Sequence, residues 1–284
     1  MHNMAILQWR WRPAAPLVTG YSQNLAEAAG KIERGQRQVI NLETHNPQGN
    51  LRPSFLASSV KGVFRSAAAW LVERVARQSG ASNYITCDYS RDVPEKWRSQ
   101  RKVSKNVALC PVCRVFGGSG CLGGDDVAPV TRFKSPVSFN FNRANDATYG
   151  SVRKSPPYRF AWEQIENKGK QLRVEQLNFE PDTVLEARLD PANDFAVALL
   201  VLSADLISSG FFRFGRFTSR GYGVVRLEPH KYYYGDLMLL MAQENISSLF
   251  VDVKGTGYQF KLSQEEQLPI LVVQDVVKQF IREL

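Results

Sequence analysis

The four cysteines of the chain have the types and spacing to bind a metal ion. Cys87, Cys110, Cys113 and Cys121 all fall within 35 residues. The segment "CPVC" is a C-x-x-C motif, and "RVFGGSGC" returns a third thiol after a glycine turn. Four soft ligands in a polar segment are typical of a tetrahedral structural Zn²⁺ site, which leaves no position open for catalysis. We therefore expect a structural zinc ion held by these cysteines.

Two other interpretations of the cysteines stay open. Four unrelated buried thiols would need no metal, and His45 could replace one ligand if Cys87 points elsewhere. A redox C-x-x-C motif fits less well, because it is expected at a helix start beside a strand and does not need two further cysteines.

A second chemical feature is the stretch "RFGRFTSRGYGVVRL", from Arg213 to Leu227, with three glycines and four arginines. Arginines supply donors to phosphate, aromatic rings stack on unpaired bases, and glycines let the backbone approach a phosphate closely. The stretch follows a helix and precedes a strand, so its context excludes both a dinucleotide fingerprint and a P-loop. We predict single-stranded nucleic-acid binding, with a plain helix-to-strand turn as the alternative. The candidate residues are Arg213, Arg216, Arg220 and Tyr222.

The start of the first clear helix, "SSVKGVFRSAAAWLVERVARQ" over 58–78, is a second candidate phosphate site. Ser58 or Ser59 is a natural N-cap. A helix N-terminus beside Lys61 and Arg65 suits an anion, because the helix dipole and free N–H groups favour negative charge. The alternative is that Lys61 and Arg65 lie on an ordinary solvated helix face.

The composition is consistent with a polyanionic partner. The 284 residues carry a formal net charge of +9, with a pI near 9.4 and 44% hydrophobic residues, enough for a sizeable core. The longest apolar run, "FAVALLVL", is far too short to span a membrane, and the N-terminus lacks the features of a signal peptide. We expect a cytoplasmic protein whose cysteines stay reduced or bind metal.

Alternation and helical periodicity predict the elements that position these residues. They give the order strand, helix, strand, strand, helix, strand, which is an α+β, ferredoxin-like (RRM-like) βαββαβ core. On the first strand, Ile6, Gln8 and Arg10 are expected on one face and Leu7, Trp9 and Trp11 on the other. An amphipathic helix is expected near the C-terminus. The segments are 5–13, 58–78, 130–141, 183–189, 191–210 and 222–228, with the last helix near 272–284.

Two of these motifs resemble those of a known family. "FGRFTSRGYGVVRL" resembles the glycine-rich loop of the RAMP superfamily of CRISPR proteins, and "LASSVKGVFRSA" resembles the helix start of its backbone branch, the Cas-seven group. "LRPSF", "NRANDAT" and "VEQLNFEPDTVLEARL" are similar to segments of type III backbone subunits. The resemblance covers about residues 4–228.

The resemblance implies a RAMP domain with a thumb hairpin at 139–160. We expect a single domain over 1–284, in which the cysteines mark a zinc-binding insertion at 79–128 and residues 229–284 form a C-terminal extension that the resemblance does not cover. The resemblance implies a subunit that binds CRISPR RNA and holds the guide–target duplex in a type III effector complex for antiviral defence. The expected partners are CRISPR RNA, target RNA and neighbouring effector subunits, without a membrane.

The resemblance also raises the question of catalysis. Type III backbone relatives typically carry a catalytic aspartate between the first strand and the first helix, but residues 18–56 contain no aspartate. The expected position falls near Asn41, whose amide is no base; Glu43 and His45 are the nearest candidates for an acid–base pair. We therefore expect little or no target-RNA cleavage. The alternative is a stand-alone or metal-dependent RAMP endoribonuclease that cuts target or precursor RNA.

Overall fold

The computed structural model describes part of the 284 residues. The described ranges are 3–15, 17, 43–45, 51–53, 57–82, 84–86, 110–117, 134–141, 148–149, 153–154, 173–174, 177–179, 181–215, 218–236, 251–252 and 268–283. Their centre is a five-stranded sheet with the order β11–β10–β1–β9–β4, in which all neighbours are antiparallel. The strands are β1 (Asn3–Pro13), β4 (Val137–Phe141), β9 (Val184–Leu189), β10 (Val225–Asp236) and β11 (Val251–Asp252).

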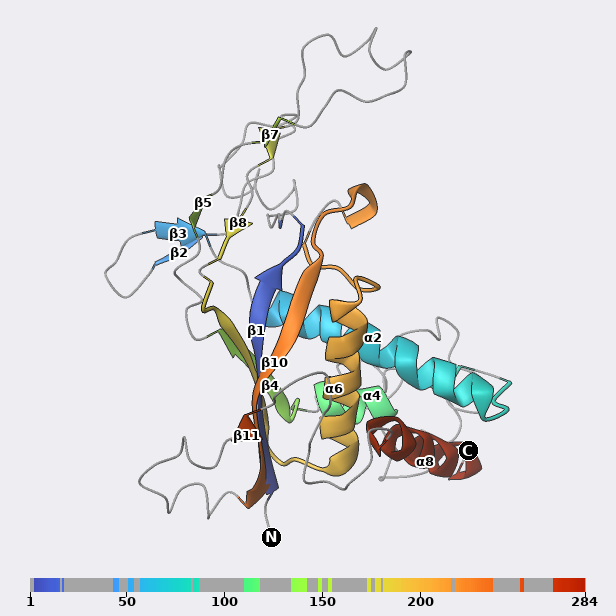
Figure 1. Cartoon of the computed structure of the whole chain (residues 1–284). Helices are drawn as coiled ribbons and strands as arrows, with labels where there is room; N and C mark the ends of the chain where they lie inside the picture. Colours follow the sequence, from blue (N-terminus) through green and yellow to red (C-terminus); the bar gives the residue numbers. More distant parts are fainter. Residues whose placement is uncertain are drawn as a thin grey trace, which may run out of the picture.

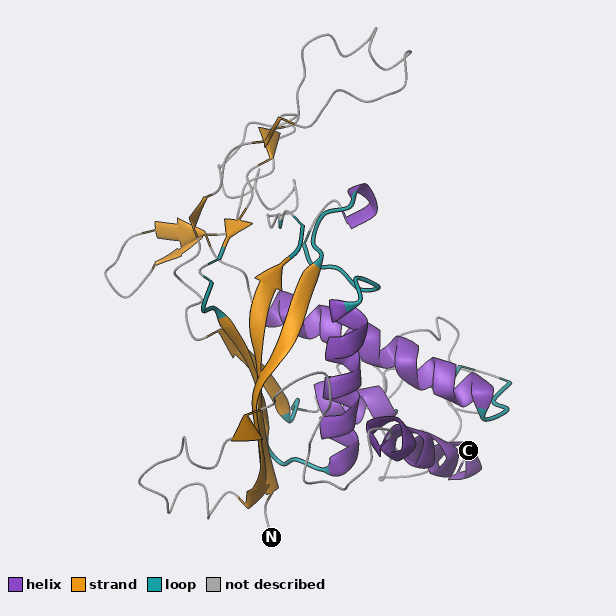
Figure 2. Ribbon diagram, in the orientation of Figure 1, coloured by secondary structure: helices purple, strands orange, loops and turns teal. Residues whose placement is uncertain are grey.

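The chain order of the core is strand, helix, strand, strand, helix, strand, as the sequence predicts. Helix α2 (Ala57–Gln78) follows β1, and α6 (Asp194–Ser208) joins β9 to β10. The short α4 (Pro111–Phe116) and the C-terminal α8 (Leu268–Glu283) complete the described helices. Figures 1 and 2 show these helices on one side of the sheet, so the fold is a mixed α/β layer structure.

Strand β1 forms because its residues alternate between two environments. Its odd-numbered side chains point under the helices, where the Trp9 ring lies 5.7 Å from the ring of Phe64 on α2. The exposed Arg10 belongs to the opposite face, so the predicted division of the strand into two faces is confirmed. The buried side chains on the helix-covered face are Ala5, Leu7, Trp9 and Trp11.

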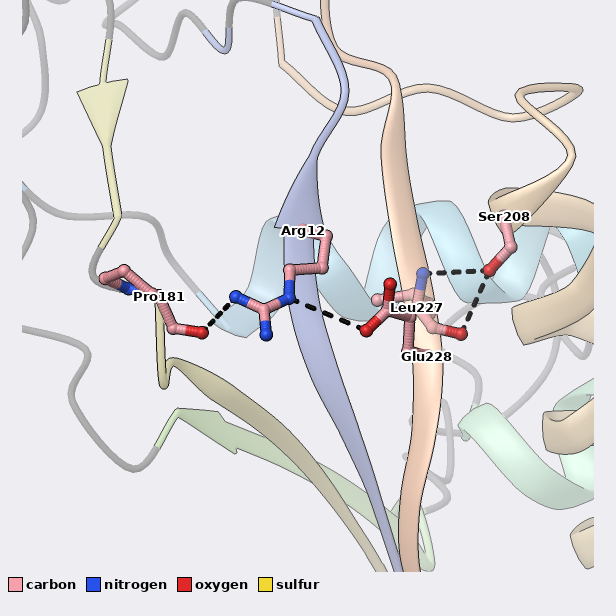
Figure 3. A network of polar contacts seen from close by, with 5 residues as sticks. All are labelled: Arg12, Pro181, Ser208, Leu227 and Glu228. Atoms are coloured by element: carbon pink, nitrogen blue, oxygen red, sulfur yellow. Dashed lines mark hydrogen bonds and ion pairs between the residues drawn. The ribbon is translucent and has the colours of Figure 1, made fainter. Parts of the chain in front are cut away.

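The opposite face of the sheet is mostly polar and cross-linked, although Ile6 on it is buried. Gln8 Nε2 donates to Glu186 Oε2 at 2.7 Å, which joins β1 to β9. Arg12 donates to the carbonyl of Pro181 before β9, and its Nε lies 3.6 Å from a carboxylate oxygen of Glu228 on β10, as Figure 3 shows. Such exposed pairs are each worth less than about 1 kcal/mol, so they set strand register more than stability.

Helix α6 is capped and tied to the sheet at its N-terminus. Asn193 Oδ1 accepts a hydrogen bond from the N–H of Ala196 at 2.8 Å, as an N-cap does. The Tyr234 hydroxyl of β10 donates to Asp194 Oδ1 at 2.7 Å. Burial, reinforced by the Asp194 carboxylate, raises the pKa of Tyr234 to about 12, so this phenol stays protonated and keeps donating at neutral pH.

Two element boundaries differ from the sequence predictions, and β10 contains a register shift. The predicted N-cap of α2 is Ser58 or Ser59, but the helix begins at Ala57, so both serines lie in its first turn. Strand β10 runs on through residue 229 to Asp236, so the predicted extension at 229–284 begins inside the core sheet. The register of β10 against β1 shifts between Gln8 and Trp9, which makes His230 an extra residue in the strand.

Three short two-stranded ladders lie outside the main sheet. Strand β2 (Glu43–His45) pairs with β3 (Leu51–Pro53). Strands β5 (Thr148–Tyr149) and β6 (Arg153–Lys154) pair with β8 (Leu177–Asn178) and β7 (Arg173–Val174), respectively. The described pairing therefore joins 148–154 to 173–178. Residues 139–141 of the predicted thumb belong to β4, where Phe139 and Phe141 are buried.

Candidate nucleic-acid interface

The glycine-rich segment 209–224 joins the end of α6 to β10 and is fixed at both ends. The Ser208 hydroxyl accepts from the Leu227 N–H at 2.9 Å and donates to the Leu227 carbonyl at 3.2 Å, so one side chain closes the base of the segment (Figure 3). The N–H groups of Ala14 and Ala15, just after β1, donate to the Val224 carbonyl at 2.8 and 3.1 Å. Hydrogen bonds therefore hold both ends of this loop in place.

A backbone contact inside the loop requires glycine. The N–H of Phe214 donates to the carbonyl of Gly223 at 2.8 Å, and the Phe214 side chain is fully buried. A Cβ atom at Gly223 would lie 1.9 Å from the Phe214 carbonyl oxygen, and the φ angle of Gly223 is +79°. Only glycine satisfies both the close approach and the left-handed backbone.

The predicted arginines of the loop have different placements. The exposed Arg213 donates from Nη1 to the Thr218 carbonyl at 2.6 Å and from Nε to the Gly210 carbonyl at 3.4 Å, so it braces the loop. The backbone of Arg220 lies in the 3₁₀ turn η1 (Thr218–Arg220), and Tyr222 is half-buried. Arg216 and the side chain of Arg220 lie outside the described residues. Phosphate contacts by these residues stay a prediction.

The first turns of α2 place the other predicted residues. Ser58 and Ser59 are exposed and Lys61 is half-buried. Burial, and then the nearby Arg65, lower the pKa of Lys61. A phosphate at this position would offset the repulsion between Lys61 and Arg65 and would favour protonated Lys61.

Arg65 has a partner that sequence reasoning missed. Its Nη1 donates to the Gly117 carbonyl at 2.6 Å, and its Nη2 donates to Cys113 Sγ at 3.2 Å. Arg65 thus joins α2 to the C-x-x-C segment, although the sequence predicted a phosphate contact.

The single carboxylate of α2 is turned inward. Glu73 is buried, and its Oε1 accepts from the N–H groups of Ile85 and Thr86 at 2.7 and 2.5 Å. The other ionisable side chains of the helix are all cationic, and they are Lys61, Arg65, Arg74 and Arg77. The outer surface of α2 therefore carries positive charge without a compensating anion of its own.

Helix α2 and the glycine-rich segment meet at an aromatic contact. The ring centroids of Trp70 and Phe211 lie 4.8 Å apart, and those of Phe211 and Phe212 lie 5.5 Å apart. The two segments predicted to bind nucleic acid thus touch each other in the folded chain. Trp70 was not selected as a site residue from the sequence. The available signal was that Trp70 lies one helical turn from Ser66 and from Arg74, and therefore on the same face of the helix.

Two of the four predicted zinc ligands are described. Cys110 and Cys113 are buried and not disulfide-bonded, and the N–H of Cys113 donates to Cys110 Sγ at 3.4 Å. Cys87 and Cys121 lie outside the described residues. Among the described ranges, no group of three or more His, Cys, Asp and Glu residues could hold a metal. The four-cysteine site stays a prediction.

The candidate catalytic residues lie on a small separate ladder. Glu43 and His45 are the two ends of β2, where they pair with Pro53 and Leu51. Their side chains lie outside the described part of the chain, so an acid–base pair stays a prediction.

Within the described residues, no helix is long and apolar enough to cross a bilayer.

The fold and the loop define an α/β protein with a braced glycine-rich loop beside a cationic helix. A family model described as the RAMP superfamily matches residues 16–226. The chain belongs to the RAMP superfamily, which confirms that part of the resemblance seen in the sequence. No curated protein matches the chain.

Several solved structures are similar over nearly the whole chain. The crystal structure of Csc2 from Thermofilum pendens has 15% identity and a TM-score of 0.46, covering 99% of this chain and 90% of that one. A chain of a type IV-B CRISPR complex has 13% identity and a TM-score of 0.45, covering 94% and 98%. The crystal structure of Csm3 from Methanopyrus kandleri has 13% identity and a TM-score of 0.43, covering 98% of each chain.

Proposed function

We propose that this RAMP protein is a guide-RNA-binding backbone subunit of a type III CRISPR effector complex. In this role it contacts CRISPR RNA through α2 and the glycine-rich loop, holds the guide–target duplex and adjoins neighbouring effector subunits. We assign it a scaffolding role and no target-RNA cleavage. The proposal includes a ferredoxin-like description of the core, since the four strands β10–β1–β9–β4 with α2 and α6 have that element order.

The observation that carries the proposal is the meeting of α2 with the glycine-rich loop. The Phe211–Trp70 contact brings an arginine-bearing loop against a helix whose only carboxylate is buried. Single-stranded nucleic acid needs cations along its backbone and flat apolar rings for its bases, and this surface offers both. A plain helix-to-strand turn would not need either feature.

The first prediction concerns the salt dependence of RNA binding. Each lost phosphate contact should lower the slope of log K against log salt by about 0.7 for single strands. We expect Lys61→Ala to lower the slope by about 0.7 and an Arg216→Ala/Arg220→Ala double variant by about 1.4, whatever the base sequence. The measurement is fluorescence anisotropy of the full chain with a labelled oligouridine RNA over a salt series. Arg188→Ala is the control, because Arg188 is exposed on the polar face of the sheet.

The pH dependence of the same binding provides an internal check on Lys61. Folding lowers the pKa of Lys61, so the unfolded chain binds this proton more tightly and stability rises as pH increases through that pKa. RNA phosphate favours the protonated form, so affinity should fall as pH increases through the lowered pKa. Lys61→Arg should remove this part of the pH profile, because arginine stays charged. If Lys61→Ala and the Arg216→Ala/Arg220→Ala double variant both keep the wild-type salt slope, these residues make no phosphate contacts and the loop is only a helix-to-strand turn.

We also propose a structural Zn²⁺ held by Cys110 and Cys113 together with Cys87 and Cys121. The two described thiols suit such a site, because one sulfur accepts a backbone N–H and the other a guanidinium N–H, which are partners that fit thiolate ligands. When bound, the ion would contribute folding free energy to the segment 79–128 and no catalysis.

The second prediction concerns this zinc. We expect about one Zn²⁺ per chain, and we expect Cys110→Ser to lose the metal and make the segment 79–128 sensitive to protease. The matched control is Val112→Ala, because Val112 is fully buried between the two cysteines but is no ligand. That variant should lose packing energy and keep its zinc. Metal analysis that finds no zinc in protein purified without chelator would contradict the proposal.

A further inference from the structure

Three aromatic rings form a small cluster where the glycine-rich loop leaves α6. Phe211 lies against Trp70 of α2 with centroids 4.8 Å apart and planes tilted by 51°, and the centroid of Phe212 lies 5.5 Å from that of Phe211. Trp70 and Phe212 are partly buried and pack against the hydrophobic core. Phe211 is 61% exposed. The cluster therefore consists of one outward ring braced by two inner ones.

The exposure of Phe211 is not explained by folding. Burying a phenylalanine side chain stabilises a protein by about 1.5–3 kcal/mol, and this position makes little use of that gain. Phe211 is also the most exposed large hydrophobic residue of the described part of the chain, ahead of Tyr84 at 48% and Leu271 at 43%. An aromatic ring that is exposed and held in place is suited to stacking on a flat partner.

The charges around the cluster indicate which partner fits. Arg74 lies one helical turn after Trp70 and Arg213 lies two residues after Phe211, and both are exposed. The Glu73 carboxylate faces inward, where it accepts two backbone N–H groups. A flat ring among exposed cations matches the alternation of base and phosphate in a nucleic acid strand. An apolar protein surface would match the ring but not the cations.

The ring is also fixed before any ligand arrives. Gly210 turns the chain with a φ of +79° directly before Phe211, and its N–H donates to the Ile207 carbonyl at 2.9 Å. Two residues later, Arg213 binds the Gly210 and Thr218 carbonyls. A ring held at both sides loses little conformational entropy on stacking, which favours binding.

We propose that Phe211, braced by Trp70, is a stacking platform for one unpaired base of single-stranded RNA. The inference rests on the proposed function, because it adds a base contact to the phosphate contacts assigned to α2 and the loop. The platform has no hydrogen-bonding group, so it accepts any base and contributes affinity without sequence preference.

The test compares ring variants on one RNA. The full chain is titrated with labelled oligouridine and with the same RNA carrying an abasic site at each position in turn. We expect Phe211→Ala to weaken binding by about 5- to 150-fold, which corresponds to about 1–3 kcal/mol per stacked base. The salt slope should stay unchanged, since no phosphate contact is lost. Phe211→Tyr should bind within about threefold of wild type, because it keeps the stacking ring.

The matched control is another exposed ring of the same region. Tyr84 follows the C-terminal end of α2, beyond the aromatic cluster, and its ring packs against the Arg77 guanidinium at 4.7 Å. Tyr84→Ala should leave RNA affinity unchanged. One abasic position should weaken wild-type binding and have no effect on Phe211→Ala, which places a base on this ring.

Two results would overturn the platform. If Phe211→Ala binds like wild type while Lys61→Ala lowers the salt slope, the RNA surface stands and the stacking ring does not. If Phe211→Ala keeps its RNA affinity but impairs association with other subunits, the ring is a protein contact. A wild-type chain that binds no RNA would instead overturn the proposed function and the platform together.

Discussion

Replacing Gly223 by alanine should destabilise the chain by more than about 4 kcal/mol, a cost reached only by severe single substitutions. The added Cβ would lie 1.9 Å from the Phe214 carbonyl oxygen, which is backbone and cannot rotate away. The positive φ of +79° adds strain for any residue with a side chain. Relief would require breaking the hydrogen bond from the Phe214 N–H to the Gly223 carbonyl. Urea unfolding followed by tryptophan fluorescence measures this loss.

Alanine variants of two other glycines distinguish the effect of the Cβ clash at Gly223 from the effect of its positive φ angle. Gly221 has a φ of +87° and no atom within 4 Å of an added Cβ, so Gly221→Ala should cost only about 1–2 kcal/mol. Gly62 also has open space at that position and lies within α2, so Gly62→Ala should stabilise the chain by about 0.5–1 kcal/mol. Equal losses for Gly221→Ala and Gly223→Ala would show that the close approach to Phe214 does not matter.

The second large effect is expected at Trp11. Its ring is 1% exposed and lies 5.0 Å from Phe141, 5.7 Å from Phe179 and 4.8 Å from Phe214. Trp11→Ala removes the shared contact of β1, β4 and the glycine-rich loop, so it should cost about 3–5 kcal/mol in unfolding free energy. Trp11→Phe keeps an aromatic ring in the same place and should cost clearly less. Similar losses for both variants would mean that this ring cluster is not what the loop rests on.

The Trp11 and Gly223 effects should not add. Both act on Phe214, one through its ring and the other through its backbone carbonyl. Residues that share a partner typically couple by about 0.5–3 kcal/mol in a double-mutant cycle. We therefore expect the loss of unfolding free energy in the double variant to differ from the sum of the two single losses, provided the double variant still folds.

Much of the core could be predicted because its elements depend on local pattern. The apolar residues of α2 recur at helical spacing, and the helix is found over nearly the predicted range. The alternation along β1 reports burial on one face, which the packed Trp9 and Trp11 rings bear out. The end of β10 was missed because a strand that continues past a proline gives no clear local signal at Pro229.

The candidate site was less predictable because its contacts join distant parts of the chain. Arg65 reaches Cys113 and Gly117, about 50 residues away, and periodicity says nothing about such a contact. The inward turn of Glu73 depends on the backbone of residues 85–86, which follow the helix. Local pattern assigns a residue to a face of a helix, but only the folded chain shows what that face meets.

The extra residue His230 divides β10 into two halves of opposite phase. Before it, Val225 and Leu227 face the helices from odd positions; after it, the even-numbered Tyr232 does so, with its ring 5.6 Å from Trp9. The half of β10 next to the glycine-rich loop and the half after His230 are thus two modules joined by a one-residue offset. Removing His230 would shift the register of one half by one residue and turn its buried side chains to solvent. Transplanting the glycine-rich loop to another scaffold therefore requires the first half of β10, cut before the offset, together with residues 11–15, which hold the loop.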